Sequence, residues 1–301
     1  KLLQKAEQTM MLAKARSRNR YQFYIASLDS EMRIRRELEK DLRGALQRNE
    51  FHLLYQPQIC FESNQVIGVE ALLRWQHPER GLVPPDLFIP LAEQNGSIIE
   101  IGDWVLDQSC RQLRQWHDSG FGQLRMAVNL STVQLHHGEL SKVVTNLMQR
   151  YQLPAQSLEL EVTETGLMED ISAAAGHLNS LKKAGVLIAI DDFGTGYSSL
   201  SYLRGLPLDK IKIDKSFVQD VLVDVDDATI VRAIIHLARS LNMQVIVEGV
   251  ETREQEAYII AQGCNEGQGY LYSRPLPANS LIDWLRSYQN EMARQTATQS
   301  N

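Results

Sequence analysis

The sequence has few cysteines, no long apolar run and no block of basic residues. Its three cysteines, Cys60, Cys110 and Cys264, are odd in number and far apart, so they form no CxxC metal motif and suit a reducing compartment. No apolar stretch approaches the roughly 18 residues of a membrane span, and the pattern of a signal peptide is missing. We therefore expect a cytoplasmic polypeptide without membrane contact of its own, although the parent protein could be membrane-tethered.

The net charge is −6 at pH 7. This value argues against a nucleic-acid polymer as partner, because such binding depends on clustered basic side chains. A small anionic ligand that is held through metal ions remains compatible with it.

The composition, 44% hydrophobic and 23% charged over 301 residues, indicates a packed core in one large α/β barrel or in two smaller domains. The chain begins at Lys1 within a helical pattern, and we interpret it as a fragment of a longer protein. Residues 1–28 read as a helix and a short strand that are too small to own a core. Residues 29–49 read as a charged linker helix, 50–290 as the main domain, and 291–301 as a polar, disordered tail.

Strand and helix patterns alternate from Phe51 onward, which is typical of a parallel sheet. About eight strands favour a closed barrel of the triosephosphate isomerase type, (β/α)8, over an open sheet. The strand at 51–59 and the strand at 66–75 are separated by a short turn, so they can pair as a hairpin. We therefore expect the first strand to run antiparallel to the rest.

The most informative stretch is VLIAIDDFGTGYSSL, residues 186–200. It begins as an apolar strand that we expect to be buried on both faces. It ends in two adjacent carboxylates, Asp191 and Asp192, followed by a loop with Gly194 and Gly196. Neighbouring carboxylates repel each other, and divalent cations would relieve the repulsion. The alternative is a strand-ending aspartate that caps the next helix.

Other strands also carry polar groups near one end, where a barrel of this type places its active site. They are Glu70, Asn129, Glu161, Glu164, Asp191, Asp192, Lys212, Asp214, Glu248 and Gln268. Buried carboxylates are costly unless they are paired or bound to metal. An all-oxygen donor set suits Mg²⁺ or Mn²⁺, and the number of acidic groups suggests two ions. Lys212 could orient a water, and the lack of histidine argues against zinc.

These positions also carry a family resemblance. From Phe51 to about Trp284 the sequence resembles the EAL domain, the cyclic di-GMP phosphodiesterase family. The naming motif is Glu70-Ala71-Leu72, and the other motifs are VNLS, LEVTE, DDFGTGYSSL, KIDKSF, VEGVET and GQGY. Before them, LAKARSRNRYQFY resembles the C-terminal end of a GGDEF (diguanylate cyclase-type) domain. That shorter resemblance includes none of the GGDEF active site and implies only a domain context.

The EAL resemblance implies roles for individual residues. One metal would be held by Glu70, Asn129, Glu161 and Asp191, and the second by Asp191 and Asp192 with Glu248 as a water-mediated ligand or base. Lys212 would contact the nucleophilic water, and Glu164 would anchor the loop that contains Gly194 and Gly196. The substrate contacts would be Gln56, Leu72, Arg74, Asp214 and Gln268.

The expected function is therefore hydrolysis of cyclic di-GMP to linear pGpG with two Mg²⁺ or Mn²⁺ ions. One alternative is a catalytically silent cyclic di-GMP receptor, and another is a dimerisation or scaffold module. The family further suggests a homodimer, and the full-length protein would carry upstream sensory or GGDEF-like domains.

Overall fold

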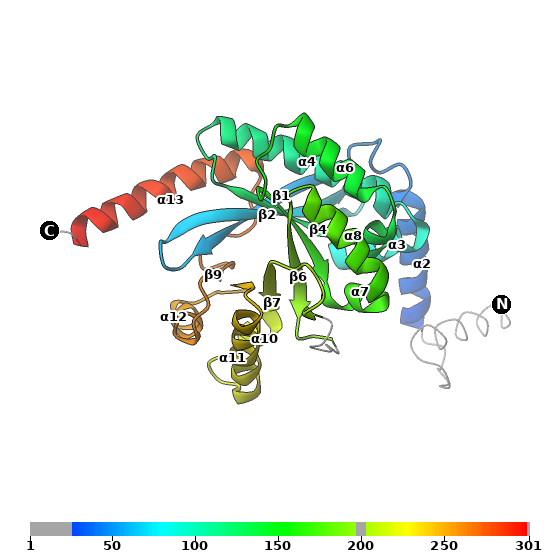
Figure 1. The fold of residues 1–301 in the computed structure, drawn as a ribbon. Helices are drawn as coiled ribbons and strands as arrows, with labels where there is room; N and C mark the ends of the chain where they lie inside the picture. The colour runs from blue at the N-terminus through cyan, green and yellow to red at the C-terminus, as the bar shows by residue number, and fades with distance from the viewer. Residues whose placement is uncertain (1–25, 197–202, 300–301) are drawn as a thin grey trace.

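The computed structural model describes residues 26–196 and 203–299. The expected GGDEF-like remnant lies almost entirely outside this part of the chain. The described strands form a closed barrel (Figure 1). Its members are β1 (Phe51–Cys60), β2 (Gln65–His77), β4 (Arg125–Leu130), β5 (Leu158–Thr163), β6 (Leu187–Phe193), β7 (Lys210–Ile213), β8 (Gln244–Val247) and β9 (Glu266–Gly267).

Strand β1 closes the barrel, because it pairs antiparallel with β2 on one side and with β9 on the other. The strands from β2 through β4 to β9 pair in parallel. The expected barrel with an antiparallel first strand is thus confirmed. A short strand, β3 (Gly81–Val83), pairs with the end of β2 outside the barrel wall.

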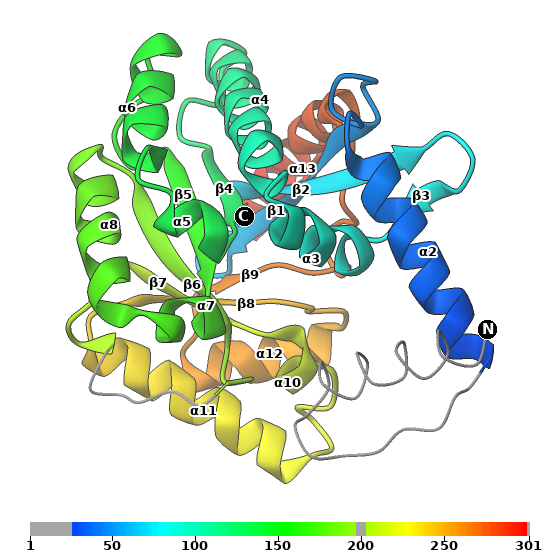
Figure 2. The same cartoon turned by 90° about the vertical axis from the view of Figure 1, so that its right-hand side faces the viewer.

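Helices cover the outside of the barrel (Figure 2). They are α3 (Pro85–Asn95), α4 (Ile98–Asp118), α5 (Thr132–His136), α6 (Leu140–Arg150), α7 (Glu164–Glu169), α8 (Ile171–Lys183), α10 (Lys215–Gln219), α11 (Val225–Ser240) and α12 (Arg253–Gln262). Among the described residues, no helix has the length and apolar character needed to cross a membrane.

Two strands show how alternation fills the barrel. In β5, Leu158, Leu160 and Val162 belong to the hydrophobic core, while the intervening Glu159 and Glu161 face the barrel interior, where both meet lysines of β7. In β7, Ile211 and Ile213 alternate in the same way with Lys210 and Lys212. Successive side chains of a strand point to opposite faces, so a Leu-Glu or Ile-Lys alternation gives an apolar outer face and a charged interior.

The helix before the barrel, α2 (Ala26–Leu42), is shorter than the expected helix over 29–49. Turns follow it, and Gly44 adopts φ +80°, a left-handed conformation that ends helices. Leu38, Leu42 and Ala45 are buried, so this segment docks onto the barrel beside α3. Figure 2 shows α2 lying along that side of the molecule.

The last helix, α13 (Ala278–Gln299), extends beyond residue 290, where we expected a disordered tail to begin. The sequence of the extension, EMARQTATQ, contains neither glycine nor proline, so nothing in it stops a helix that has already formed. Polarity alone was therefore a poor guide to the end of this helix.

Candidate active site

The polar residues predicted at the strand ends converge around Lys212, whose side chain is fully buried inside the barrel. Its Nζ lies 2.6 Å from Glu161 Oε2, 2.8 Å from Glu248 Oε1, 3.2 Å from Asp191 Oδ1 and 3.7 Å from Glu70 Oε1. These four carboxylates come from β2, β5, β6 and the residue after β8. Closure of the barrel thus brings together groups that are up to 178 residues apart (248 − 70).

Glu70 is held by two amide side chains in addition to the lysine. Asn129 Nδ2 donates to Glu70 Oε1 at 2.6 Å, and Gln268 Nε2 donates to Glu70 Oε2 at 2.6 Å. Gln268 Nε2 also donates to Gln56 Oε1 at 3.0 Å, and Gln56 Nε2 donates to the backbone oxygen of Ser273 at 3.0 Å. Both amide hydrogens of Gln268 therefore serve the protein, and its buried Oε1 has no partner within the described residues.

The protonation of the cluster follows from burial and crowding. Burial would favour the neutral form of Glu70, but Lys212, Gln268 and Asn129 outweigh it and lower the pKa of this carboxyl. Burial raises the pKa of Glu161 well above its usual range. Lys212 opposes this rise, whereas the neighbouring carboxylates of Glu70 and Asp191 add to it. Burial also raises the pKa of Glu248 to about 8 in spite of Lys212.

Lys212 itself stays charged. Burial favours its neutral form, but Asp191, Glu161, Glu248 and Glu70 outweigh that effect and raise the pKa of the ammonium well above its usual range. The cluster therefore combines one ammonium with carboxyl groups that compete for it, and burial favours the protonated form of Glu161 and Glu248.

Asp192 adopts a backbone conformation that is uncommon for a residue other than glycine, with φ +54°. Its backbone N–H donates to Asp191 Oδ1 at 2.9 Å, which ties the two neighbours together. Burial, Asp191 and Asp214 raise the pKa of Asp192 to about 6. Strained residues of this kind persist where the surroundings fix them, often at active sites.

The donor chemistry of the cluster fits hard divalent cations. Among the described residues, no three acidic, histidine or cysteine side chains are arranged to hold a metal ion, and the carboxylates converge on the Lys212 ammonium instead. Glu161 Oε1 is nevertheless buried without a hydrogen-bond partner in this part of the chain. Carboxylate oxygens and the Asn129 side chain form the oxygen-rich set that Mg²⁺ or Mn²⁺ prefers.

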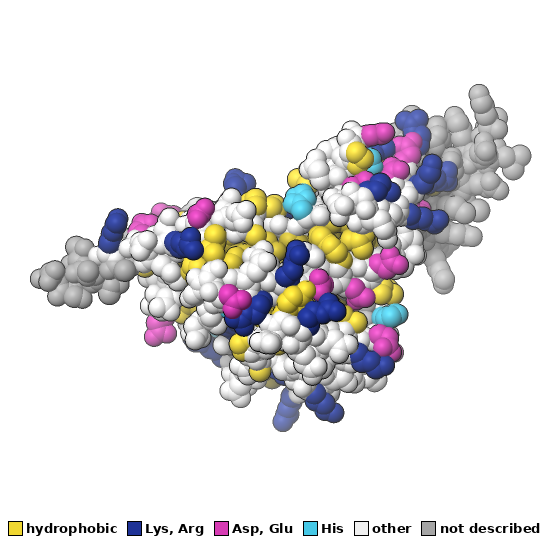
Figure 3. Space-filling model, turned by 90° about the horizontal axis from the view of Figure 1, so that it is seen from above, with side chains coloured by type: hydrophobic (Ala, Val, Ile, Leu, Met, Phe, Trp, Pro, Cys, Tyr) yellow, Lys and Arg dark blue, Asp and Glu magenta, His cyan; other side chains and the backbone are white. Residues whose placement is uncertain are grey.

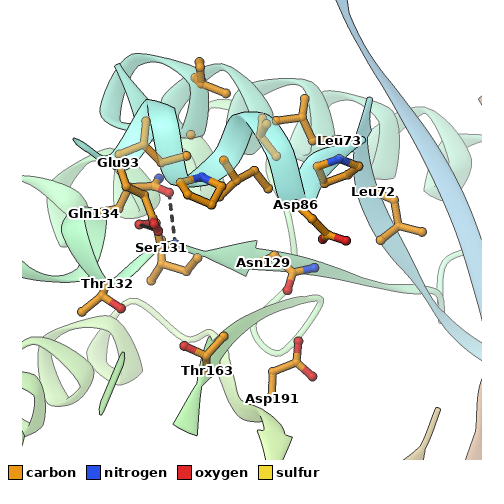
Figure 4. Close-up of a pocket in the computed structure, with 18 of the residues that line it drawn as sticks. Leu72, Leu73, Asp86, Glu93, Asn129, Ser131, Thr132, Gln134, Thr163 and Asp191 are labelled. Carbon is orange, nitrogen blue, oxygen red and sulfur yellow. Dashed lines mark hydrogen bonds between the residues drawn. The ribbon is translucent and has the colours of Figure 1, made fainter. Parts of the chain in front are cut away.

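Two pockets open beside the cluster. One, of about 420 Å³, extends from Asn129, Asp191 and Asp192 towards α3 and α4 (Figure 4). The other, of about 360 Å³, is lined by Glu70, Asp191, Glu248 and residues after β9. Both pockets share Leu72, Arg74 and Asp191, so these three residues stand between them.

The five predicted substrate contacts do not all line these pockets. Gln56, Leu72, Arg74 and Gln268 line the smaller pocket. Arg74 Nη1 donates to the backbone oxygen of Leu73 at 2.9 Å, and within the described residues its other guanidinium nitrogens are left for a ligand. Asp214 lies near Asp192 but lines neither pocket, and its carboxylate accepts from the backbone N–H of Ser216 and so caps α10.

Glu164 lies at the start of α7, next to the loop that follows β6. Its Oε2 accepts a hydrogen bond of 2.9 Å from the backbone N–H of Gly194. A side chain at Gly196 would come within 3.1 Å of Glu164 Oε1, so the loop passes close to this carboxylate. Residues 197–202 of the DDFGTGYSSL motif lie outside the described part of the chain.

Sequence reasoning missed several residues that line the smaller pocket, among them Lys215, Glu251 and Tyr270. Glu251 belongs to the VEGVET motif, so its position three residues after Glu248 was the available signal. Tyr270 follows the GQGY glycine, and its ring lies 4.2 Å from the guanidinium carbon of Arg274. That contact joins residues of one loop and could not be read from the sequence.

Comparison with known proteins gives a consistent result. The model of the EAL domain family matches residues 39–275. The chain is 46% identical over 281 residues to the bifunctional diguanylate cyclase/cyclic di-GMP phosphodiesterase MucR of Pseudomonas aeruginosa, covering 93% of the chain and 41% of MucR. It is 43% identical over 292 residues to the cyclic di-GMP phosphodiesterase NbdA of the same organism, covering 97% of the chain and 37% of NbdA. The chain thus spans about two-fifths of the length of these relatives.

Solved structures agree with this picture. A structure described as the PaMucR phosphodiesterase in complex with c-di-GMP has a TM-score of 0.79 and 48% sequence identity, and the match covers 81% of this chain and 99% of that one. The EAL domain of Mycobacterium smegmatis DcpA has a TM-score of 0.68 and 35% identity over 79% of this chain and 98% of its own.

Proposed function

Because the chain belongs to the EAL domain family, we propose that it is a metal-dependent phosphodiesterase that hydrolyses cyclic di-GMP to linear pGpG. The names of its relatives and the c-di-GMP complex of a 48% identical protein support the substrate class. The geometry around Lys212 supports the reaction type.

The observation that carries the proposal is the charge balance of the cluster. Four carboxylates, those of Glu70, Glu161, Asp191 and Glu248, lie within 4 Å of the Lys212 ammonium, and a fifth, Asp192, interacts electrostatically with Asp191 beside them. If all were ionised, the sum would be −5 + 1 = −4, which is the charge that two divalent cations neutralise. The raised pKa values of Glu161, Glu248 and Asp192 show that the cluster resists this ionisation on its own.

We assign one ion to Glu70, Asn129, Glu161 and Asp191, and a second to Asp191 and Asp192 with Glu248 nearby. Two such ions would supply Lewis-acid stabilisation of the phosphoryl group and an acidified water. Lys212, Glu248 and Glu70 complete the catalytic set. Lys212 would orient the attacking water by hydrogen bonding, and Glu248 would accept its proton when ionised, a form that burial disfavours by raising its pKa to about 8.

The pockets suit a ligand with two similar halves. Leu72, Arg74 and Asp191 stand between them, so a phosphodiester placed at the cluster would direct one nucleoside into each pocket. Arg74 would contact a phosphate oxygen. The free Oε1 of Gln268 can accept from a guanine N–H group, and Gln56 fixes the orientation of that amide. Asp214 remains a proposed guanine contact. A homodimer and upstream sensory domains also remain proposals for the full-length protein.

The test is to incubate the chain with cyclic di-GMP and Mg²⁺ or Mn²⁺ and to follow pGpG by chromatography. We expect product in the presence of either metal and none with EDTA. Tight binding of cyclic di-GMP without product would favour the silent receptor, and dimerisation without any nucleotide binding would favour the scaffold.

Glu164→Ala is expected to lower kcat by roughly 10–100-fold, because a hydrogen bond to a charged acceptor contributes about 1.5–3 kcal/mol to holding the loop after β6. Glu164→Gln, which keeps an acceptor for the Gly194 N–H, should retain more activity than the alanine variant. Hydrogen exchange at Gly194 and Gly196 should quicken in step with the loss of kcat. Unchanged exchange and unchanged kinetics in the alanine variant would contradict a loop-anchoring role.

A further inference from the structure

A second group of charges lies inside the barrel, on the side away from the pockets. We call Arg125, Glu159, Lys210 and Glu266 the lower ion layer. Lys210 is almost fully buried, and its Nζ lies 2.9 Å from Glu159 Oε2 and 3.0 Å from Glu266 Oε2. Arg125 Nη2 lies 3.8 Å from Glu266 Oε1. The layer has two cations and two carboxylates, so it is balanced without any metal.

The lower ion layer is unusual for its place in the fold. The interior of a (β/α)8 barrel is normally filled with branched apolar side chains. Burying an ion pair costs desolvation energy that the attraction barely repays, so well-packed apolar residues are often equally stable or more stable. Stability alone therefore gives a weak reason for these charges, and none of them takes part in the proposed chemistry.

The layer lies directly beneath the active-site cluster. Glu159 precedes Glu161 by two residues on β5, and Lys210 precedes Lys212 by two on β7. Glu266 precedes Gln268 by two residues at β9. Since residues two apart point to the same face of a strand, Glu159, Lys210 and Glu266 each support the backbone that directs an active-site side chain.

The strand β9 is the weakest part of the barrel wall. It has only two residues, each with one partner in β8 and one in β1. The Lys210–Glu266 ion pair joins β7 to β9 across β8, and the Lys210–Glu159 pair joins β7 to β5 across β6. Gln268, which follows β9, then holds Glu70 through its side-chain amide.

We propose that Lys210 is a positioning residue for the active site: by holding Glu159 and Glu266 beneath the cluster, it fixes β9 and β5 so that Gln268 orients Glu70 and Glu161 faces the metals. The role in turnover rests on the proposed phosphodiesterase activity. The role in orienting Glu70 does not, because it can be measured through metal binding alone.

The experiment replaces the ions by apolar residues of similar size in the variant K210M/E159L/E266L. We expect its melting temperature to stay close to that of the unmodified chain, since all the paired charges are removed together except Arg125, which reaches the surface. We expect Mn²⁺ affinity, measured by calorimetry, to weaken by about 10–100-fold, as for groups that orient metal ligands. In the cyclic di-GMP assay, kcat should fall by a similar factor while KM changes little.

A double-mutant cycle locates the effect. If the layer acts through Gln268, the weakening of Mn²⁺ affinity by the triple variant should largely disappear in a Gln268→Ala background. The matched control is K142M/E139L, which removes an exposed pair on α6 and should leave Mn²⁺ affinity unchanged.

A well-folded triple variant with normal Mn²⁺ affinity would overturn the proposal, whether or not the chain hydrolyses cyclic di-GMP. Absence of hydrolysis by the unmodified chain, together with weakened Mn²⁺ binding in the variant, would refute the proposed function and keep the positioning role. If the triple variant does not fold, the single variant Glu266→Gln tests the proposal instead. It removes the ion pair between Lys210 and β9 and leaves the Lys210–Glu159 pair in place. Weakened Mn²⁺ affinity supports the proposal, and unchanged affinity rejects it.

Discussion

Glu70→Ala is expected to abolish turnover of cyclic di-GMP, with kcat at least about 10³-fold lower, which corresponds to about 4 kcal/mol of transition-state stabilisation. Glu70 is the point where Lys212, Asn129 and Gln268 meet, so its removal takes one partner from each of the three. The alanine variant should also bind less Mn²⁺ when measured by elemental analysis after gel filtration, because one proposed metal loses a carboxylate ligand.

Two further variants serve as controls for Glu70→Ala. Glu62→Ala, at an exposed position in the β1–β2 turn, should behave as the unmodified chain. Glu70→Gln keeps the shape and one oxygen but loses the charge, and it should fall between the two in metal content. If Glu70→Ala retains normal turnover with normal Mn²⁺ content, the metal assignment at this residue is wrong.

Lys212→Met is expected to abolish turnover and to make folding depend on divalent metal. Without the ammonium, the four carboxylates that now lie within 4 Å of it, three of them buried, would face one another. Removing one partner of a buried ion network costs about 3–5 kcal/mol. The free energy of unfolding in EDTA should fall by about that amount, and Mg²⁺ or Mn²⁺ should restore much of it, since bound metal stabilises the folded state.

Denaturation in urea with EDTA, and again with saturating Mg²⁺, measures this effect. Lys142→Met removes an exposed lysine that pairs with Glu139 on the same helix and should shift neither curve measurably. Equal stability of Lys212→Met and the unmodified chain in EDTA would show that the carboxylates tolerate one another without the lysine. The charge argument for two metal ions would then fail.

The sequence predicted the barrel well because two of its signals are local. Apolar segments with a polar group at one end indicated the strands, and the short turn between the first two indicated antiparallel pairing. The meeting of the polar residues around Lys212 could also be predicted, because a closed barrel brings the ends of all its strands to one mouth. The position of Asp214 could not be predicted from the sequence, since an aspartate after a strand can face a pocket or cap the next helix. In the structure it caps α10.

The lower ion layer shows where sequence reasoning reached its limit. The alternations in LELEV and KIKID indicated two buried charges on each strand. Only the second charge of each strand, Glu161 or Lys212, was assigned to the active-site cluster. The partner of Lys210 could not be identified, because Glu266 lies on a strand of two residues that has no periodicity to recognise. Helix ends were equally hard to place. Gly44 ended α2 early, whereas a polar sequence without glycine or proline let α13 continue.

The position of α3 has a mechanical consequence. One side of α3 packs on α2, while Pro85, Ile89 and Glu93 from the same helix line the larger pocket. Glu93 Oε1 also accepts a hydrogen bond of 2.6 Å from Ser131, two residues after Asn129. A torque on the amino-terminal end of α2 would therefore reach the wall of the pocket through a single intervening helix. Figure 1 shows α2 and α13 on opposite sides of the barrel, and Figure 3 shows the molecule from above, with apolar side chains gathered across the middle of that face.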